Sequence, residues 1–169
     1  QKPVVPRYGR LEYGPMPTSS LTDGHRRPQA AAALERYLHT QIPISQALGV
    51  RVLRADCGGV LLVAPLMANL NHRQTFFGGS AVALATLAAW ALAHQKLLEE
   101  EELDVHLVIQ RSRMEYLEPA VAEVEAKCLA PVPEQWDRML RTVQRRGRGR
   151  IELEVVLRAE GTVIGSFKG

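Results

Sequence analysis

The longest apolar stretch of the chain lies near its middle. Residues 80–98 contain mostly Ala, Leu and Val, with no Gly or Pro, and therefore predict a helix. Polar residues are nearly absent before His94, which predicts that every face of this helix is buried. Its length would also suit a membrane span, but the Ala-rich composition and the polar, strand-like flanks favour a core helix.

Two kinds of pattern precede this helix. Residues 30–42 carry apolar side chains at helical spacing and predict a short helix that ends near Pro43. From residue 50 the pattern changes to period two, so residues 50–56 and 60–64 predict two strands joined by a glycine turn at 57–59.

After the central helix, the chain is predicted to form four strands, interrupted once by a short helix or a covering loop. Residues 105–117 alternate between two faces, and a Glu-Pro turn at 118–119 predicts that residues 121–129 pair back on them. Strands gathered around one buried helix indicate an α+β fold whose antiparallel sheet wraps that helix. The short helix or covering loop is expected at 131–145, and the last two strands at 151–158 and 162–167.

Composition limits the classes of protein to consider. With 169 residues, 46% apolar and 23% charged, the chain suits one globular domain, predicted at 30–169, after a proline-rich arm or linker at 1–29. The net charge of +3 permits anionic ligands without indicating nucleic acid. Two cysteines fit a reducing compartment, so we expect a cytoplasmic protein that is not inserted in a membrane.

A polar loop with a double glycine leads into the central helix. The amides of Gly78 and Gly79 lie where a helix has no internal hydrogen-bond partners, so they are predicted to stabilise a developing negative charge. The alternative is that the two glycines allow the helix to pack closely against a strand. Asn71 is expected either to position a water molecule or to cap a turn of the loop. His72 is the candidate general base, although a loop histidine can equally be uncommitted. These four residues form the predicted catalytic set.

The string Thr75-Phe-Phe-Gly-Gly-Ser80, followed by an Ala-rich helix containing Trp90, resembles the YiiD C-terminal thioesterase family. The stretches 112–120 and 147–153 are also similar, and the resemblance covers about residues 33–169. It implies a hot-dog fold and a homodimer or dimer of dimers. It also implies pockets near the dimer interface for an acyl thioester of coenzyme A or acyl carrier protein. The carrier is then part of the substrate, and no separate cofactor or metal is expected.

The loop departs from one established pattern. Phenylacetyl-CoA-type hot-dog thioesterases carry Asn-x-x-Gly-x-x-His-Gly-Gly and a carboxylate seven residues past the second glycine. On this pattern Asn71 matches the Asn, whereas Gln74 replaces the Gly, Phe77 replaces the His and Thr86 replaces the carboxylate. A Thr on an Ala-rich helix has no base beside it in sequence, so hydrolysis would need another group.

The remaining candidates are predicted to bind substrate. Gln74 is a candidate to position water in place of the missing carboxylate, and Ser80 is expected at the helix N-cap or in its first turn. Arginines on the 105–117 strand and in 145–150 are candidates for coenzyme A phosphates or an acidic carrier surface, or else form a solvated face. No aromatic residues interleave with the arginines at 145–150, which argues against RNA. The predicted substrate-binding set is Asn69, Gln74, Thr75, Phe77, Ser80, Arg111 and Arg113. For Asn69, as for Asn71, a structural role in the loop is the alternative.

The sequence therefore predicts an acyl-thioester hydrolase, with a role in fatty acid metabolism. Three alternatives stay open: a module that binds acyl thioesters without hydrolysing them, a hydroxyacyl-thioester dehydratase, and an interaction domain without a small ligand. The missing carboxylate favours the binding module, whereas a dehydratase would need a histidine where Phe77 stands.

Overall fold

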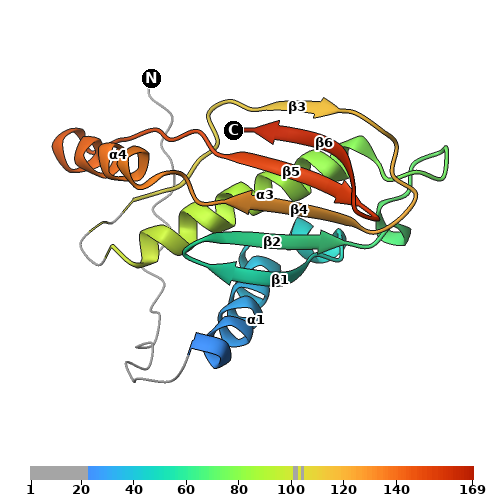
Figure 1. The fold of residues 1–169 in the computed structure, drawn as a ribbon, viewed down its shortest axis with the longest axis horizontal. Helices are drawn as coiled ribbons and strands as arrows, with labels where there is room; N and C mark the ends of the chain where they lie inside the picture. The colour runs from blue at the N-terminus through green and yellow to red at the C-terminus, as the bar shows by residue number, and fades with distance from the viewer. Residues whose placement is uncertain (1–22, 101–102, 104) are drawn as a thin grey trace.

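The computed structural model describes residues 23–100, 103 and 105–169, and the fold is drawn in Figure 1. The helices are α1 (Asp23–Gln41), α2 (Pro43–Ala47), the 3-10 helix η1 (Met67–Asn69), α3 (Gly78–Leu98) and α4 (Pro133–Arg146). The strands are β1 (Arg51–Asp56), β2 (Gly59–Ala64), β3 (Arg113–Tyr116), β4 (Val124–Leu129), β5 (Glu154–Ala159) and β6 (Thr162–Lys168).

One antiparallel sheet with the order β1-β2-β4-β5-β6-β3 packs its inner face on α3. Figure 1 shows α3 running along the sheet, with α1 near the β1 edge. Inward side chains alternate along the central strands, as in β4, where Val124, Ala126 and Cys128 are fully buried. The predicted α+β architecture, an antiparallel sheet wrapped around one long helix, is confirmed.

The central helix ends at Leu98 as predicted and is long and apolar enough to cross a membrane. It serves instead as the core helix against the sheet, with Leu84, Ala88 and Leu92 completely buried. The prediction that every face is buried was wrong, because Val82 and Trp90 are only partly covered. An apolar helix face shows what can be buried, but not whether another part of the same chain covers it.

The predicted hairpin between residues 105–117 and 121–129 was also wrong. β3 pairs with β6, whereas β4 lies between β2 and β5. After Pro119 the chain turns toward the loop before α3, where the carbonyl of Ala120 accepts the Phe76 N–H at 2.8 Å. Residues 105–112 form no strand among the described residues, and the strand that follows them, β3, is an outer strand of the sheet.

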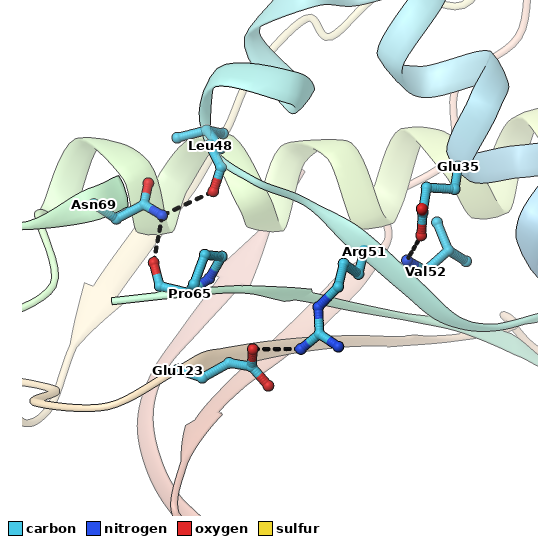
Figure 2. A network of polar contacts seen from close by, with 7 residues as sticks. All are labelled: Glu35, Leu48, Arg51, Val52, Pro65, Asn69 and Glu123. Atoms are coloured by element: carbon cyan, nitrogen blue, oxygen red, sulfur yellow. Dashed lines mark hydrogen bonds and ion pairs between the residues drawn. The ribbon is translucent and has the colours of Figure 1, made fainter. Parts of the chain in front are cut away.

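The first helix begins at Asp23, earlier than the predicted start at residue 30. Pro28 suggested a linker, yet α1 continues through it, at a position where proline removes one backbone hydrogen bond and crowds the carbonyl four residues earlier. The rest of the predicted arm, residues 1–22, lies outside the described residues. α1 packs on β1, and Figure 2 shows the Glu35 carboxylate accepting the Val52 N–H at 2.8 Å. The insertion at 131–145 is a helix, α4, rather than a loop.

Candidate active site

Backbone hydrogen bonds hold the segment that enters α3 from two sides. The N–H of Phe77 donates to the carbonyl of Asn69 at 2.7 Å, and the preceding Phe76 N–H donates to Ala120. Phe77 is the N-cap residue, and its carbonyl accepts the Ala81 N–H at 3.0 Å. The first turn of α3 is therefore fixed in position by the loop on one side and by the β3–β4 connection on the other.

The start of α3 leaves backbone donors available. Among the described residues, no side chain caps this helix and no acceptor takes the N–H groups of Gly78, Gly79 and Ser80. Such amides carry the partial positive charge of the helix terminus and bind anionic oxygen well. Gly78 also lines a pocket, so the start of the helix lies beside a cavity that a ligand can enter.

The pocket has a volume of about 310 Å³, at the small end of the range for small-molecule sites. One wall is apolar and suits a hydrocarbon chain. Its apolar residues are Phe76, Ala81, Met114, Leu117, Pro119, Ala120 and Ile164. Its polar side chains come from Thr75, Tyr116 and Glu118.

Tyr116 reaches from β3 to the helix start. Its hydroxyl donates to the carbonyl of Gly78 at 3.0 Å. Because that carbonyl and the Gly79 N–H belong to one planar peptide, this bond also fixes the direction of the Gly79 N–H. A Cβ on Gly78 would lie 3.2 Å from the Tyr116 ring, and one on Gly79 would overlap the ring of Phe77. Glycine at both positions thus lets two aromatic rings pack against the helix start.

Among the described residues, Glu118 is the only carboxylate that lines this pocket. The sequence places it in the stretch 112–120, which resembles the family, but it gives no sign that this stretch meets Gly78. Neither Tyr116 nor Glu118 was among the predicted site residues. The pairing of β3 with β6, which a local pattern does not reveal, brings them to the helix start. Thr86, at the position of the usual carboxylate, lies two turns further along α3 and does not line the pocket.

The side chain of Asn71 is engaged within its own loop. Its Nδ2 donates to Thr75 Oγ1 at 2.8 Å, and its Oδ1 accepts the N–H groups of Arg73 and Thr75 at 2.8 and 3.2 Å. These bonds close a tight turn in which Gln74 adopts a left-handed φ of 61°. The geometry therefore matches the turn-capping alternative for Asn71, and its predicted role in positioning water stays a prediction.

Asn69 is 2% exposed and holds the loop to the core. Figure 2 shows its Nδ2 between two carbonyls, donating to Leu48 at 2.9 Å and to Pro65 at 2.8 Å. Its Oδ1 is also buried and accepts no hydrogen bond from any described residue. A substrate would not reach this side chain, so the geometry gives Asn69 a structural role.

The other predicted residues are divided between the pocket and the surface. Thr75 lines the pocket, Phe77 is 53% exposed beside it, and Ser80 lies buried in the first turn of α3. The remaining four are exposed and do not line the pocket; they are His72, Gln74, Arg111 and Arg113. Of these, Arg113 forms a surface ion pair with Glu115 at 2.6 Å. In the part of the chain that the structure describes, no group of His, Cys, Asp and Glu side chains could hold a metal ion.

A family model described as "Putative thioesterase (yiiD_Cterm)" matches residues 31–169. The chain belongs to this family. The match includes the double-glycine loop, α3 and the pocket lining described above.

Solved structures agree with this assignment. A protein with unknown function from Chlorobaculum tepidum is 29% identical, with a TM-score of 0.77 over 84% of this chain and 92% of that one. A structure titled a putative thioesterase from Shewanella oneidensis is 28% identical, with a TM-score of 0.71 over 84% and 95%. The E. coli PaaI protein of the phenylacetic acid degradation operon is 16% identical, with a TM-score of 0.59 over 83% and 91%, which shows the fold alone. The fold is that of the hot-dog thioesterases.

Proposed function

We propose that this protein hydrolyses acyl thioesters of coenzyme A or acyl carrier protein, with the reacting carbonyl at the start of α3. The observation that carries the proposal is the uncapped first turn of α3, whose Gly78 opens onto a pocket with an apolar wall. The amides suit a developing oxyanion, and the apolar wall suits an acyl chain. Membership of the thioesterase family supports the same reaction class.

Glu118 is the group that we propose as general base. It takes a proton from water as the water oxygen attacks the thioester carbonyl carbon, and the amides hold the resulting oxyanion. Collapse of this intermediate breaks the carbon–sulfur bond, and the departing thiolate takes the proton back from Glu118. The products are the free acid and the thiol. In this scheme Glu118 replaces the carboxylate that Thr86 does not supply.

The test compares two isosteric changes on neighbouring carboxylates. Glu118→Gln should lower kcat by about 10²- to 10⁴-fold, the usual contribution of general base catalysis. Glu115→Gln is the matched control, because Glu115 lies outside the pocket and only pairs with Arg113 at the surface. It should change kcat less than about twofold. Equal effects of the two changes would remove Glu118 from the mechanism.

Asn71→Ala and His72→Ala test the predicted catalytic roles of the loop. With Glu118 as base, His72→Ala should keep kcat, because His72 is exposed and does not line the pocket. Asn71→Ala should act through the turn it closes, and so lower stability and activity together. A large loss of kcat in the His72 variant without loss of stability would make His72 the base instead.

We also propose a homodimer that forms at the β3 side of the sheet. Val108 and Ile109 in the segment before β3 are 83% and 54% exposed. β3 is an outer strand of the sheet, and an open sheet edge beside exposed apolar residues is a ready site for pairing with another strand. Val108→Asp should shift the molar mass by light scattering from dimer to monomer, whereas Ile44→Asp, on exposed α2, should not. A wild-type monomer would contradict the proposal.

A further inference from the structure

A second concave surface lies far from the pocket, between α4, the segment that follows it and the outward face of β4 and β5. We call it the α4 groove; its volume is about 1080 Å³. α4 packs beside the C-terminal end of α3, where the Trp136 indole N–H donates to Glu100 at 3.4 Å. Figure 1 shows α4 at the opposite end of α3 from the Gly78 turn. Because α3 has 21 residues, the two places are separated by about 30 Å along the helix.

The apolar face of α4 is buried within the protein. Trp136, Met139 and Val143 are buried against residues from the end of α3 and the segment after it. Lys96 lies 4.9 Å above the Trp136 ring and adds a cation–π contact. These contacts fix the orientation of the helix, so its exposed arginines lie at a defined edge of the groove.

Positive charge is concentrated in the groove. Its basic lining residues are Lys127, Arg138, Arg146, Arg148, Arg150 and Arg158, and its acidic ones are Glu152 and Glu154. The balance is therefore six minus two, or +4, compared with +3 for the whole chain. Glu154 is already paired with Lys168 at 2.6 Å. Arg138, Arg146, Arg148 and Arg150 form no ion pair with any described carboxylate, so their charge is available to a ligand.

The groove also exposes apolar surface. Leu129, Val132 and Val156 are 56%, 55% and 37% exposed, and all three line it. No aromatic side chain of the described residues lines it, so these residues offer no stacking platform for nucleic-acid bases or for adenine. Exposed aliphatic side chains beside unpaired arginines complement a ligand that is itself apolar on one face and acidic on the other.

We infer that the α4 groove docks an acidic amphipathic helix of a partner protein. The apolar face of that helix covers Leu129, Val132 and Val156, while its carboxylates pair with the arginines of α4 and of residues 148–150. A helix lying in a groove with apolar anchors and charged edges is a common mode of peptide recognition. The inference does not rest on thioester hydrolysis, since the groove shares no lining residue with the pocket at Gly78.

The probe is a fluorescein-labelled, helix-stapled peptide of about 14 residues, which matches the length of α4. It carries Leu at helical spacing on one face and Glu on the others. A peptide of the same composition, with the Leu residues spread around the helix, is the matched ligand control. Fluorescence anisotropy should show binding of the amphipathic peptide that is at least about tenfold tighter and that weakens as salt is added.

Protein variants then assign the binding to the groove. Arg148→Glu with Arg150→Glu should weaken binding about tenfold or more. Arg36→Glu with Arg73→Glu reverses the same number of charges at exposed sites outside the groove and should have less than about a twofold effect. Val156→Asp should weaken binding without unfolding the protein, because this side chain points outward from β5.

Three results would overturn the inference. One is equal binding of the two peptides, and another is equal loss of binding in the two double variants. The third is displacement of the peptide by a single-stranded oligonucleotide at lower concentration than by unlabelled peptide, which would assign the groove to nucleic acid. If Val156→Asp instead changes the molar mass of the protein, a second copy of this chain covers the groove and the inference is wrong.

Discussion

Replacing Asn69 by Ala tests how the loop is fixed before the pocket. The substitution removes two hydrogen bonds, of 2.9 and 2.8 Å, and leaves the carbonyls of Leu48 and Pro65 without this donor. Each bond contributes about 1 kcal/mol net, and a buried carbonyl left unpaired costs about 1–3 kcal/mol, so we expect about 2–4 kcal/mol in total. For a chain of this size that loss lowers Tm by roughly 5–15 °C.

Asn69→Asp separates the hydrogen-bond explanation from simple loss of volume. Asp keeps the shape but places a carboxylate oxygen against the same two carbonyls, so it should destabilise at least as much as Ala at neutral pH. Lowering the pH should reduce the loss for Asp relative to Ala, because a protonated carboxyl can donate one hydrogen bond.

The assay is urea unfolding followed by circular dichroism, with His72→Ala as a control at an exposed position of the same loop. A change of less than about 0.5 kcal/mol for Asn69→Ala would refute the structural role. An unchanged stability together with a raised KM would instead restore Asn69 to the predicted substrate-binding set.

Three further predictions concern single side chains. Tyr116→Phe should lower kcat about 2- to 10-fold, at constant KM and nearly constant Tm. The variant loses one hydrogen bond, which orients the Gly79 N–H, and the residue is exposed, so the effect on stability is small. A raised KM alone would contradict this prediction. His94 stacks on Tyr37 and Trp90, with 4.7 Å between ring centroids in each pair, and burial lowers its pKa below 6.5. The unfolded chain then binds more protons, so this contribution to stability is present above pH 6.5 and is lost as the pH falls toward the folded pKa; pH-dependent melting of His94→Phe should lack that loss. Burial raises the pKa of Cys128 to about 12, whereas Cys57 is exposed. A thiol reagent should therefore modify only Cys57 in the native protein and both cysteines after unfolding. Rapid labelling of Cys128 in the native protein would contradict this and show that β4 opens.

The central helix and the double glycine at its N-terminus could be predicted because the sequence patterns that specify them are local. An unbroken Ala and Leu pattern specifies α3 to its last residue, Leu98, and two consecutive glycines at its start indicate backbone donors. The turn at Cys57 and the two strands around it follow equally from period two and glycine. In each case residues within a few positions of one another determine the structure.

The pocket could not be predicted, because it depends on strand order. Tyr116 and Gly78 are separated by 38 residues and meet only because β3 pairs with β6 at the sheet edge. The predicted hairpin would place β3 beside β4, so the sequence did not predict the contact between Tyr116 and Gly78. Likewise, Asn69 and Asn71 have the same residue type in one loop, but only burial shows that Asn69 faces the core.

The measurement that most directly tests the account is thiol release by the purified protein from acyl-coenzyme A and acyl-carrier-protein thioesters of short to long chain. Hydrolysis should appear as loss of thioester absorbance with a clear optimum in chain length. Binding of acyl-coenzyme A without release from any of these thioesters would contradict the proposed hydrolysis and assign the protein to the binding modules.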